Sequence, residues 1–281
     1  MLLEQFLPLN KLDLIVARSD EFKSGHPFPH IIVDDFLPTE VYRQLVADFP
    51  GPKDHAWLRY KAPVERDKLQ STSELTMPSS IRAAIQAFNS STFVAFVEKL
   101  TGINNIIPDP HLFGGGMHQT LPGGHLSLHV DYNIHNKWRL DRRLNAILYL
   151  NEGWEEEWGG ALELWEGSPS EVRTCIKKIA PVGNRLVIFT TNEISWHGHP
   201  DPLACPPDRT RKSLAFYYYS NGRPEEERAA EHNTRFVGRP GETFPSPSGE
   251  KFLRSLKGIV HDWLPPVMFR ALQRLRKKNA P

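Results

Sequence analysis

The chain has 281 residues, of which 40% are hydrophobic and 24% are charged, values typical of a soluble globular protein. A formal net charge of +1 excludes a domain-wide basic surface for nucleic acid, and the two cysteines are too few for a disulfide framework. Glu4, Lys11 and Asp13 interrupt the apolar N-terminal stretch, which argues against a signal peptide, and no run is long enough to span a membrane. We therefore expect a cytoplasmic protein without a transmembrane segment.

The N-terminal third of the chain is predicted to be largely helical. Residues 1–25 form a helical extension, and a short strand follows near 30–36. Apolar residues then recur at helical spacing over 39–49 and again over 78–100. Between these two segments, the polar stretch 51–77 contains scattered prolines and is predicted to be a long loop.

The character of the sequence changes after Gly102. Between residues 111 and 220, seven short β-type runs follow one another without intervening helices. They are HLFGGGMHQ, HLSLHVD, RLNAILYLN, GALELWEG, VRTCIKKI, NRLVIFTT and RKSLAFYYYS. The segment LPGG at 121–124 is expected to form a tight turn before the second run. This series indicates an antiparallel sandwich or barrel.

Residues 223–281 are predicted to form a basic, helical C-terminal extension. A charged loop leads to residues 251–278, which are predicted to form two amphipathic helices separated by two prolines. Residues 251–278 carry eight basic residues and one acidic residue, Asp262. We expect the helices to pack on the domain, and contact with an anionic membrane surface or an acidic partner is the alternative.

A possible metal site lies in the β-rich region. In the HVD motif at 129–131, the first and third residues point to the same face of a strand, so an imidazole and a carboxylate converge. One distant histidine would complete a triad of two histidines and one carboxylate, which leaves three adjacent coordination positions open and suits Fe(II). A second such motif, HPD at 199–201, contains a proline that argues for a turn.

Two further features follow in the order that such a site needs. His197 stands just beyond an apolar strand and can supply the second histidine, with His199 as the rival for that position. Farther along, Arg211 and Ser213 stand two residues apart at the start of a strand, so both face the same side and can bind a carboxylate.

In their order, the runs HVDYN, RRLNAILYLNEGWEEEWGGALELWEG, NRLVIFTTNEISWHGH and RKSLAFYYY resemble the prolyl-hydroxylase-type branch of the 2-oxoglutarate/iron(II) oxygenases. The chain is similar in particular to the hypoxia-factor prolyl hydroxylases and to bacterial proline-hydroxylase-like proteins, which share an opening like PFPHIIVDDFLP. The resemblance covers residues 26–222. It implies a mainly β fold with flanking helices, whose core is a double-stranded β-helix, a jelly roll of the cupin type.

The resemblance also implies roles for individual residues. Carried over by position, His129, Asp131 and His197 resemble the iron ligands. Arg211 resembles the residue that pairs with the far carboxylate of 2-oxoglutarate, and Tyr149 resembles a tyrosine that hydrogen-bonds the same carboxylate. His197 is preferred over its rival because its spacing from the preceding apolar strand matches the family.

Other positions complete the expected cosubstrate pocket. Because side chains alternate along a strand, Asn145 and Ile147 share the face of the pocket tyrosine and are expected to line the pocket. Ser213 and Leu162 are further candidates for its wall. The chain departs from the family at Gln119, where many members have a tyrosine, and in a longer segment between the distal histidine and the arginine.

The activity implied by the resemblance is hydroxylation of an unactivated C–H bond. Fe(II) is the expected metal and 2-oxoglutarate the cosubstrate, with succinate and CO2 as products and L-ascorbate as a reductant of the iron. The carboxylate of Asp131 favours hydroxylation over halogenation, because related halogenases lack that ligand. The alternative is a non-enzymatic cupin-like domain that binds or senses a metal or ligand, and a cupin of another chemistry, such as an isomerase, is a third reading. The expected substrate is a small molecule or a prolyl residue in a peptide.

Overall fold

The computed structural model describes residues 6–242 of the chain. Contacts between residues divide the chain into two units, Met1–Glu242 and Thr243–Pro281, and all described residues belong to the first. The two helices predicted within 251–278 lie outside the described residues, and so does the choice between packing and membrane contact. In the described part of the chain, no helix is long and apolar enough to cross a membrane.

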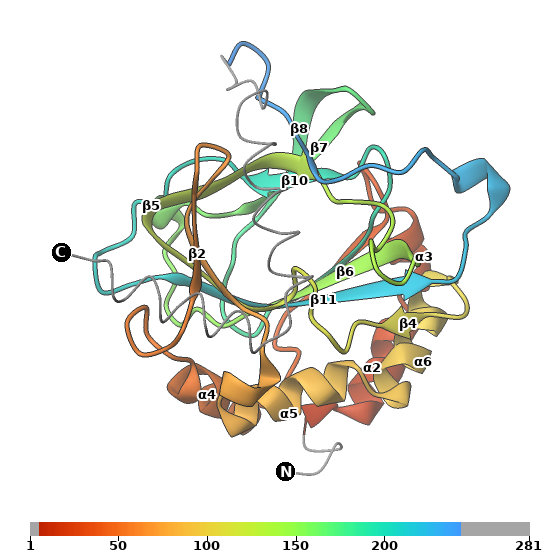
Figure 1. Cartoon of the computed structure of the whole chain (residues 1–281). Coiled ribbons are helices and arrows are strands. Elements are labelled where there is room, and N and C mark those ends of the chain that lie inside the picture. The colour runs from red at the N-terminus through yellow and green to blue at the C-terminus, as the bar shows by residue number, and fades with distance from the viewer. Residues whose placement is uncertain (1–5, 243–281) are drawn as a thin grey trace, which may run out of the picture. The chain divides into compact units, whose positions relative to one another are not determined.

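The helices come early in the chain and form a layer on one side of the sheet (Figure 1). They are α2 (Leu9–Val16), α3 (Ser19–Lys23), α4 (Thr39–Asp48), α5 (Ser79–Phe88) and α6 (Ser91–Thr101). Helix α5 buries Ile81, Ile85 and Phe88, which recur at helical spacing. The ring of Phe88 stacks on Phe216 of the sheet, with centroids 4.2 Å apart. Burial of such a side chain contributes about 1.5–3 kcal/mol, so this face fixes the helical layer to the sheet.

The second predicted helical segment is divided into α5 and α6 at Asn89 and Ser90. The Ser90 side chain accepts a hydrogen bond from the backbone N–H of Phe93, and this N-cap starts α6. Helix α6 ends at Gly102, whose φ of 76° lies in the left-handed region that favours glycine.

Twelve strands form one sheet in the described residues. They are β1 (His30–Val33), β2 (Leu58–Ala62), β3 (Glu65–Ser71), β4 (Ile107–Pro108), β5 (Gly116–Val130), β6 (Asp141–Tyr149), β7 (Leu162–Ser168), β8 (Glu171–Ile179), β9 (Leu186–Thr190), β10 (Trp196–His199), β11 (Arg211–Ser220) and β12 (Arg235–Phe236). The main path runs β1-β9-β6-β11-β5-β10-β7-β8, and the neighbouring strands are antiparallel.

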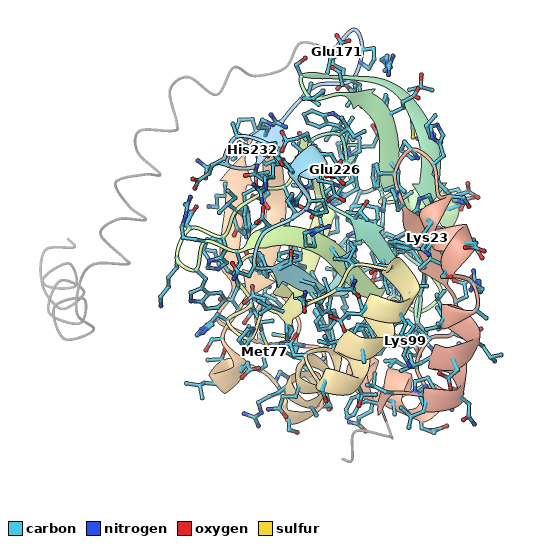
Figure 2. The ribbon with its side chains drawn as sticks, turned by 90° about the vertical axis from the view of Figure 1, so that its right-hand side faces the viewer. Lys23, Met77, Lys99, Glu171, Glu226 and His232 are labelled. Carbon is cyan, nitrogen blue, oxygen red and sulfur yellow. The ribbon has the colours of Figure 1, made fainter. Side chains whose placement is uncertain are left out.

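The long strand β5 joins the two halves of the curled sheet. Its first part pairs with β11 and its last part pairs with β10, so β6 and β11 lie in one half and β10 and β7 in the other (Figure 1). The helices cover the half that contains β6 and β11, as Figure 2 shows from the side, where Lys99 of α6 and Glu171 at the start of β8 lie at opposite ends. The other face of that half, between the two halves of the sheet, is where β5 and β10 bring the site residues together.

The predicted mainly β fold with flanking helices and a jelly-roll core is confirmed. Two local predictions are wrong. The expected loop 51–77 contains the hairpin β2–β3, and β3 pairs with β5. The expected turn at 121–124 does not reverse the chain. In the pairing of β3 with β5, Arg66 faces His125 and Lys68 faces Thr120. Residues 121–124 therefore bulge out within one continuous strand.

The segment 223–242 belongs to the same compact unit as the sheet. It contains a short 3-10 helix at Glu225–Glu227 and the strand β12, which pairs with the end of β5. The domain boundaries at 25 and 222 remain predictions, and this part of the predicted extension is attached to the sheet as a loop and a strand.

Candidate metal centre

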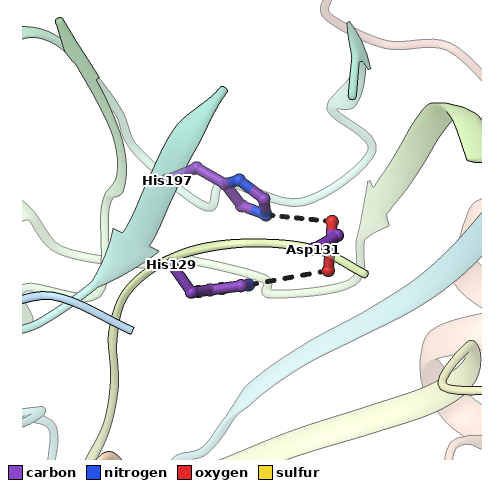
Figure 3. Close-up of side chains that lie close together, drawn as sticks. All are labelled: His129, Asp131 and His197. Atoms are coloured by element: carbon purple, nitrogen blue, oxygen red, sulfur yellow. Dashed lines mark ion pairs between the residues drawn. The ribbon is translucent and has the colours of Figure 1, made fainter. Parts of the chain in front are cut away.

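The structure brings the three predicted metal ligands together (Figure 3). His129 lies near the end of β5, and Asp131 follows directly after that strand. Strand β10 places His197 opposite His129 in antiparallel register, so the two rings lie with centroids 4.3 Å apart. Asp131 Oδ1 is 3.8 Å from His129 Nε2, and its Oδ2 is 3.6 Å from His197 Nε2. All three residues therefore direct one ligand atom at a common point.

Backbone carbonyl groups orient both imidazoles. Nδ1 of His129 lies 2.9 Å from the carbonyl oxygen of Ser127, and Nδ1 of His197 lies 2.8 Å from that of Ser195. Because a carbonyl can only accept, each Nδ1 carries the proton and each Nε2 keeps a lone pair for a metal. Burial lowers the pKa of both rings, that of His197 to about 3, so both are neutral near pH 7.

A hydrogen bond and an ion pair hold the carboxylate of Asp131. Asn145 Nδ2 donates to Oδ2 at 2.8 Å, and Arg142 Nη2 lies 3.1 Å from the same oxygen. Burial acts to raise the pKa of Asp131, but the charge of Arg142 and the neighbouring groups outweigh it, and the pKa lies well below its usual range. The carboxylate is therefore ionised, and its Oδ1 makes neither of these two contacts.

The sequence pattern did not indicate Arg142, and a bulge explains why. Strict alternation would put Arg143 on the same face as Asn145. The register between β6 and β11 shifts so that Tyr218 faces Leu144 and the next residue faces Arg142. This shift turns Arg142 inward, where its guanidinium lies 3.5 Å from the ring centroid of Tyr217 and only 1% of the side chain is exposed.

The donor set fits Fe(II). Two neutral imidazoles and one carboxylate form the facial triad used by non-haem iron oxygenases, with coordination positions left for other ligands. Among residues 6–242, these three residues form the group of histidine, cysteine or acidic side chains that could hold a metal ion. His199, the rival for the distal position, is not part of that group.

Arg211 and Tyr149, the residues predicted to bind a carboxylate, are buried and lie side by side. Arg211 Nη2 donates to the hydroxyl oxygen of Tyr149 at 3.1 Å, and Arg211 Nε donates to the carbonyl of Gly160 at 2.7 Å. Because the Tyr149 hydroxyl accepts from the guanidinium and burial raises its pKa, its own proton is available for a further acceptor. Tyr149 packs in one apolar cluster with Leu162 and Ile147. This combination suits the far carboxylate and the methylene groups of a dicarboxylic acid.

Gly160 has two reasons to be glycine. Its φ is +73°, and a Cβ there would lie 2.6 Å from Leu203 Cδ2 and 3.1 Å from Arg211 Cδ. A side chain at this position would therefore displace the arginine.

Three comparisons with known proteins bear on this site. A family model described as the 2OG-Fe(II) oxygenase superfamily matches residues 115–219, which include the triad and the arginine. Residues 115–219 therefore correspond to the 2OG-Fe(II) oxygenase domain of this superfamily. The predicted resemblance is confirmed, and the family name gives Fe(II) and 2-oxoglutarate as cofactor and cosubstrate.

Relatives of the oxygenase domain include prolyl hydroxylases. The mouse protein named Prolyl 3-hydroxylase OGFOD1 is 32% identical over 84 residues, which are 30% of this chain and 15% of that protein. A Pseudomonas putida prolyl-4-hydroxylase structure has a TM-score of 0.53 at 20% identity, covering 74% of this chain and 100% of that one. A Trichoplax adhaerens prolyl hydroxylase, solved with a hypoxia inducible factor peptide, has a TM-score of 0.51 at 17% identity, covering 75% and 90%. At these identities the structures show the fold alone.

The other positions that the sequence analysis singled out make specific contacts in the structure. Asn145, predicted to line the cosubstrate pocket, contacts the metal carboxylate as described above. Ser213 is buried and pairs with Tyr149 across β11 and β6. Gln119 accepts a hydrogen bond from Thr210 at 2.6 Å and donates to the carbonyl of Pro50 at 3.2 Å. Where many family members have a tyrosine, the side-chain amide of Gln119 thus contacts two loops. The roles of these residues in binding 2-oxoglutarate remain predictions.

Sequence patterns also gave no indication of Phe236 in β12. Its ring lies 5.5 Å from that of His129, because β12 pairs with β5 at this histidine. Glu193 holds the segment that carries Phe236, through a hydrogen bond with His232 at 2.7 Å and an ion pair with Arg235 at 2.6 Å. Figure 2 labels His232 on this segment. Phe236 therefore forms part of the wall of the metal centre, although it lies outside the residues 115–219 that the family model matches.

Proposed function

We propose that the chain is an Fe(II)- and 2-oxoglutarate-dependent hydroxylase. The observation that carries this proposal is the position of the Arg211–Tyr149 pair near the metal triad. Tyr149 packs in one apolar cluster with Phe189, whose ring centroid lies 4.8 Å from that of His197. A metal-binding or sensing domain has no need of both a triad with open positions and a buried guanidinium with unused donors.

The residues of the chain have separate tasks in this proposal. The triad would hold Fe(II), and the bound metal supplies the oxygen-dependent redox chemistry that protein side chains lack. Arg211 and Tyr149 would bind the far carboxylate of 2-oxoglutarate and so fix its orientation toward the metal. The apolar walls formed by Ile147 and Leu162 exclude water from the interior.

The overall reaction would consume one 2-oxoglutarate, one O2 and one substrate C–H bond. It would yield succinate, CO2 and the hydroxylated substrate, so one oxygen atom enters the new hydroxyl group and the other enters succinate. The substrate proposed first is a prolyl residue in a peptide, because the relatives reported above are named as prolyl hydroxylases. A free small molecule is the second substrate class to test.

The test is succinate release by the purified protein with Fe(II), ascorbate and 2-oxoglutarate. We expect release that is lost in Asp131→Ala and that increases when a proline-containing peptide library is added. The hydroxylated product would carry a mass gain of one oxygen atom. Wild-type protein that binds Fe(II) but neither binds nor decarboxylates 2-oxoglutarate would contradict the proposal and support the non-enzymatic alternative.

A further inference from the structure

His199 lies deep in the interior, next to the metal centre but outside it. It stands two residues after His197 on β10, and it pairs with Leu126 of β5. Residues two apart on a strand face the same side, so the side chain of His199 points into the interior like that of His197. Only 4% of His199 is exposed.

The ring of His199 lacks the partner that the metal-site histidines have. Nδ1 of each metal-site histidine contacts the carbonyl two residues earlier. In the described structure, Nδ1 of His199 is buried and has no hydrogen-bond partner. A neutral imidazole has one N–H donor and one acceptor, and a buried polar group without a partner is unfavourable. A buried Nδ1 without a partner therefore indicates a ligand that completes its hydrogen bonding.

The neighbours of His199 identify the chemistry of that ligand. Strand pairing places the start of β11 beside the end of β10, because Arg211 pairs with Thr120 of β5 and His199 pairs with Leu126. Thr120 and His125 lie opposite two residues of β3 that are only two positions apart, so the bulge at 121–124 brings the two pairs close together. The side chains of Arg211 and His199 are both buried. Leu203, four residues farther along, lies with Arg211 around Gly160. An anion seated on Arg211 would lie within the same enclosed space as the His199 ring.

We propose that a ring N–H of His199 donates a hydrogen bond to the far carboxylate of bound 2-oxoglutarate, beside Arg211 and Tyr149. His199 is then a residue that selects a dicarboxylate, and it takes no part in metal binding. This inference rests on the proposed function, because it assigns a further contact to the same cosubstrate.

The test compares two ligands and two variants. Titration calorimetry with Mn(II)-loaded protein gives dissociation constants for 2-oxoglutarate and for 2-oxopentanoate, which has the same chain without the far carboxylate. His199→Leu removes the donor at similar volume, and His199→Asn keeps an N–H near the position of Nδ1. We expect His199→Leu to weaken 2-oxoglutarate binding about tenfold, with His199→Asn less affected. Binding of 2-oxopentanoate and of Mn(II) alone should not change.

Several results would overturn the inference. Equal losses for both ligands in the two variants would assign His199 a packing role, and loss of Mn(II) binding would make it a metal ligand. Unchanged 2-oxoglutarate affinity in His199→Leu would show that the contact is absent. In each of these cases, wild-type protein that binds 2-oxoglutarate and releases succinate would leave the proposed function intact, and only the role of His199 would be wrong. Wild-type protein that does not bind 2-oxoglutarate would contradict both the proposed function and the role of His199.

Discussion

Arg142 Nη2 lies 3.1 Å from Oδ2 of Asp131, and Asn145 Nδ2 donates to the same oxygen at 2.8 Å. One oxygen of the metal-site carboxylate is thus held by a hydrogen bond and an ion pair from β6. Arg142 also donates to Asn145 Oδ1 at 2.8 Å, so the two β6 residues fix each other. This arrangement fixes the orientation of the Asp131 carboxylate between the two histidines, and it makes β6 part of the metal site although β6 contributes no ligand.

Removal of a triad residue should abolish metal binding. We expect His129→Ala, Asp131→Ala and His197→Ala each to lose high-affinity Fe(II) binding and turnover, because two ligands do not hold the ion. Anaerobic calorimetry with Fe(II) measures the affinity, and His26→Ala is a control because His26 is exposed. A triad variant that binds Fe(II) as tightly as wild type would show that its residue is not a ligand.

Loss of the donor at Asn145 should weaken the metal site without removing a ligand. Asn145→Ala leaves only the ion pair with Arg142 on Asp131 Oδ2, and we expect Fe(II) affinity to fall about 10–100-fold, as is typical for groups that orient a ligand. Arg143→Ala is the matched control on the same strand, since Arg143 pairs with Glu227 at 2.9 Å. If both variants lose the same affinity, the effect comes from general damage to β6.

Arg211 should control the affinity for 2-oxoglutarate. Loss of a charge-assisted contact in Arg211→Ala should cost about 2 kcal/mol, which is roughly a thirtyfold rise in the dissociation constant. Arg209→Ala is the control, because Arg209 is half exposed and lies close to Asp208. Calorimetry with Mn(II)-loaded protein measures both. A larger effect at Arg209 would move the carboxylate site to that residue.

A methyl group at Gly160 should disturb the cosubstrate site through Arg211. Gly160→Ala combines a positive φ with close contacts to Leu203 and Arg211, so both stability and 2-oxoglutarate affinity should fall. Gly153→Ala shares the positive φ, at +57°, and has nothing within 4 Å of its Cβ. It should therefore lose stability by about 1–2 kcal/mol and keep its affinity. Thermal unfolding and calorimetry separate the two effects, and equal affinities would contradict this explanation.

The stability of the metal-free protein should decrease as the pH falls below about 6.5. Burial lowers the pKa of His30 and His118, so these rings stay neutral in the folded protein where the unfolded chain takes up protons. The unfolded state then binds more protons, and each histidine reduces the free energy of unfolding by at most about 1.4 kcal/mol per pH unit. Denaturant unfolding with a chelator at several pH values measures this slope. His30→Gln should reduce it, and a wild-type profile that stays flat down to about pH 5 would contradict the prediction.

The sequence by itself determined the chemistry of the site and the class of the fold. Alternation along a strand puts His129 and Asp131 on one face, and the order of His197 and Arg211 after them follows from the motifs. Short β-type runs with turn residues between them indicated the antiparallel core, because local composition and period two are properties of single strands.

The tertiary structure decided what depends on pairing between strands far apart in the chain. The hairpin β2–β3 was not predicted from its polar sequence, because it gains its partner only when β3 pairs with β5. A register shift against β11 turned Arg142 toward Asp131, and pairing of β12 placed Phe236 beside His129. Nδ1 of His199 is likewise buried without a hydrogen-bond partner only in the folded sheet, where β10 pairs with β5. Register and burial are properties of strand pairs and cavities, so no local pattern encodes them.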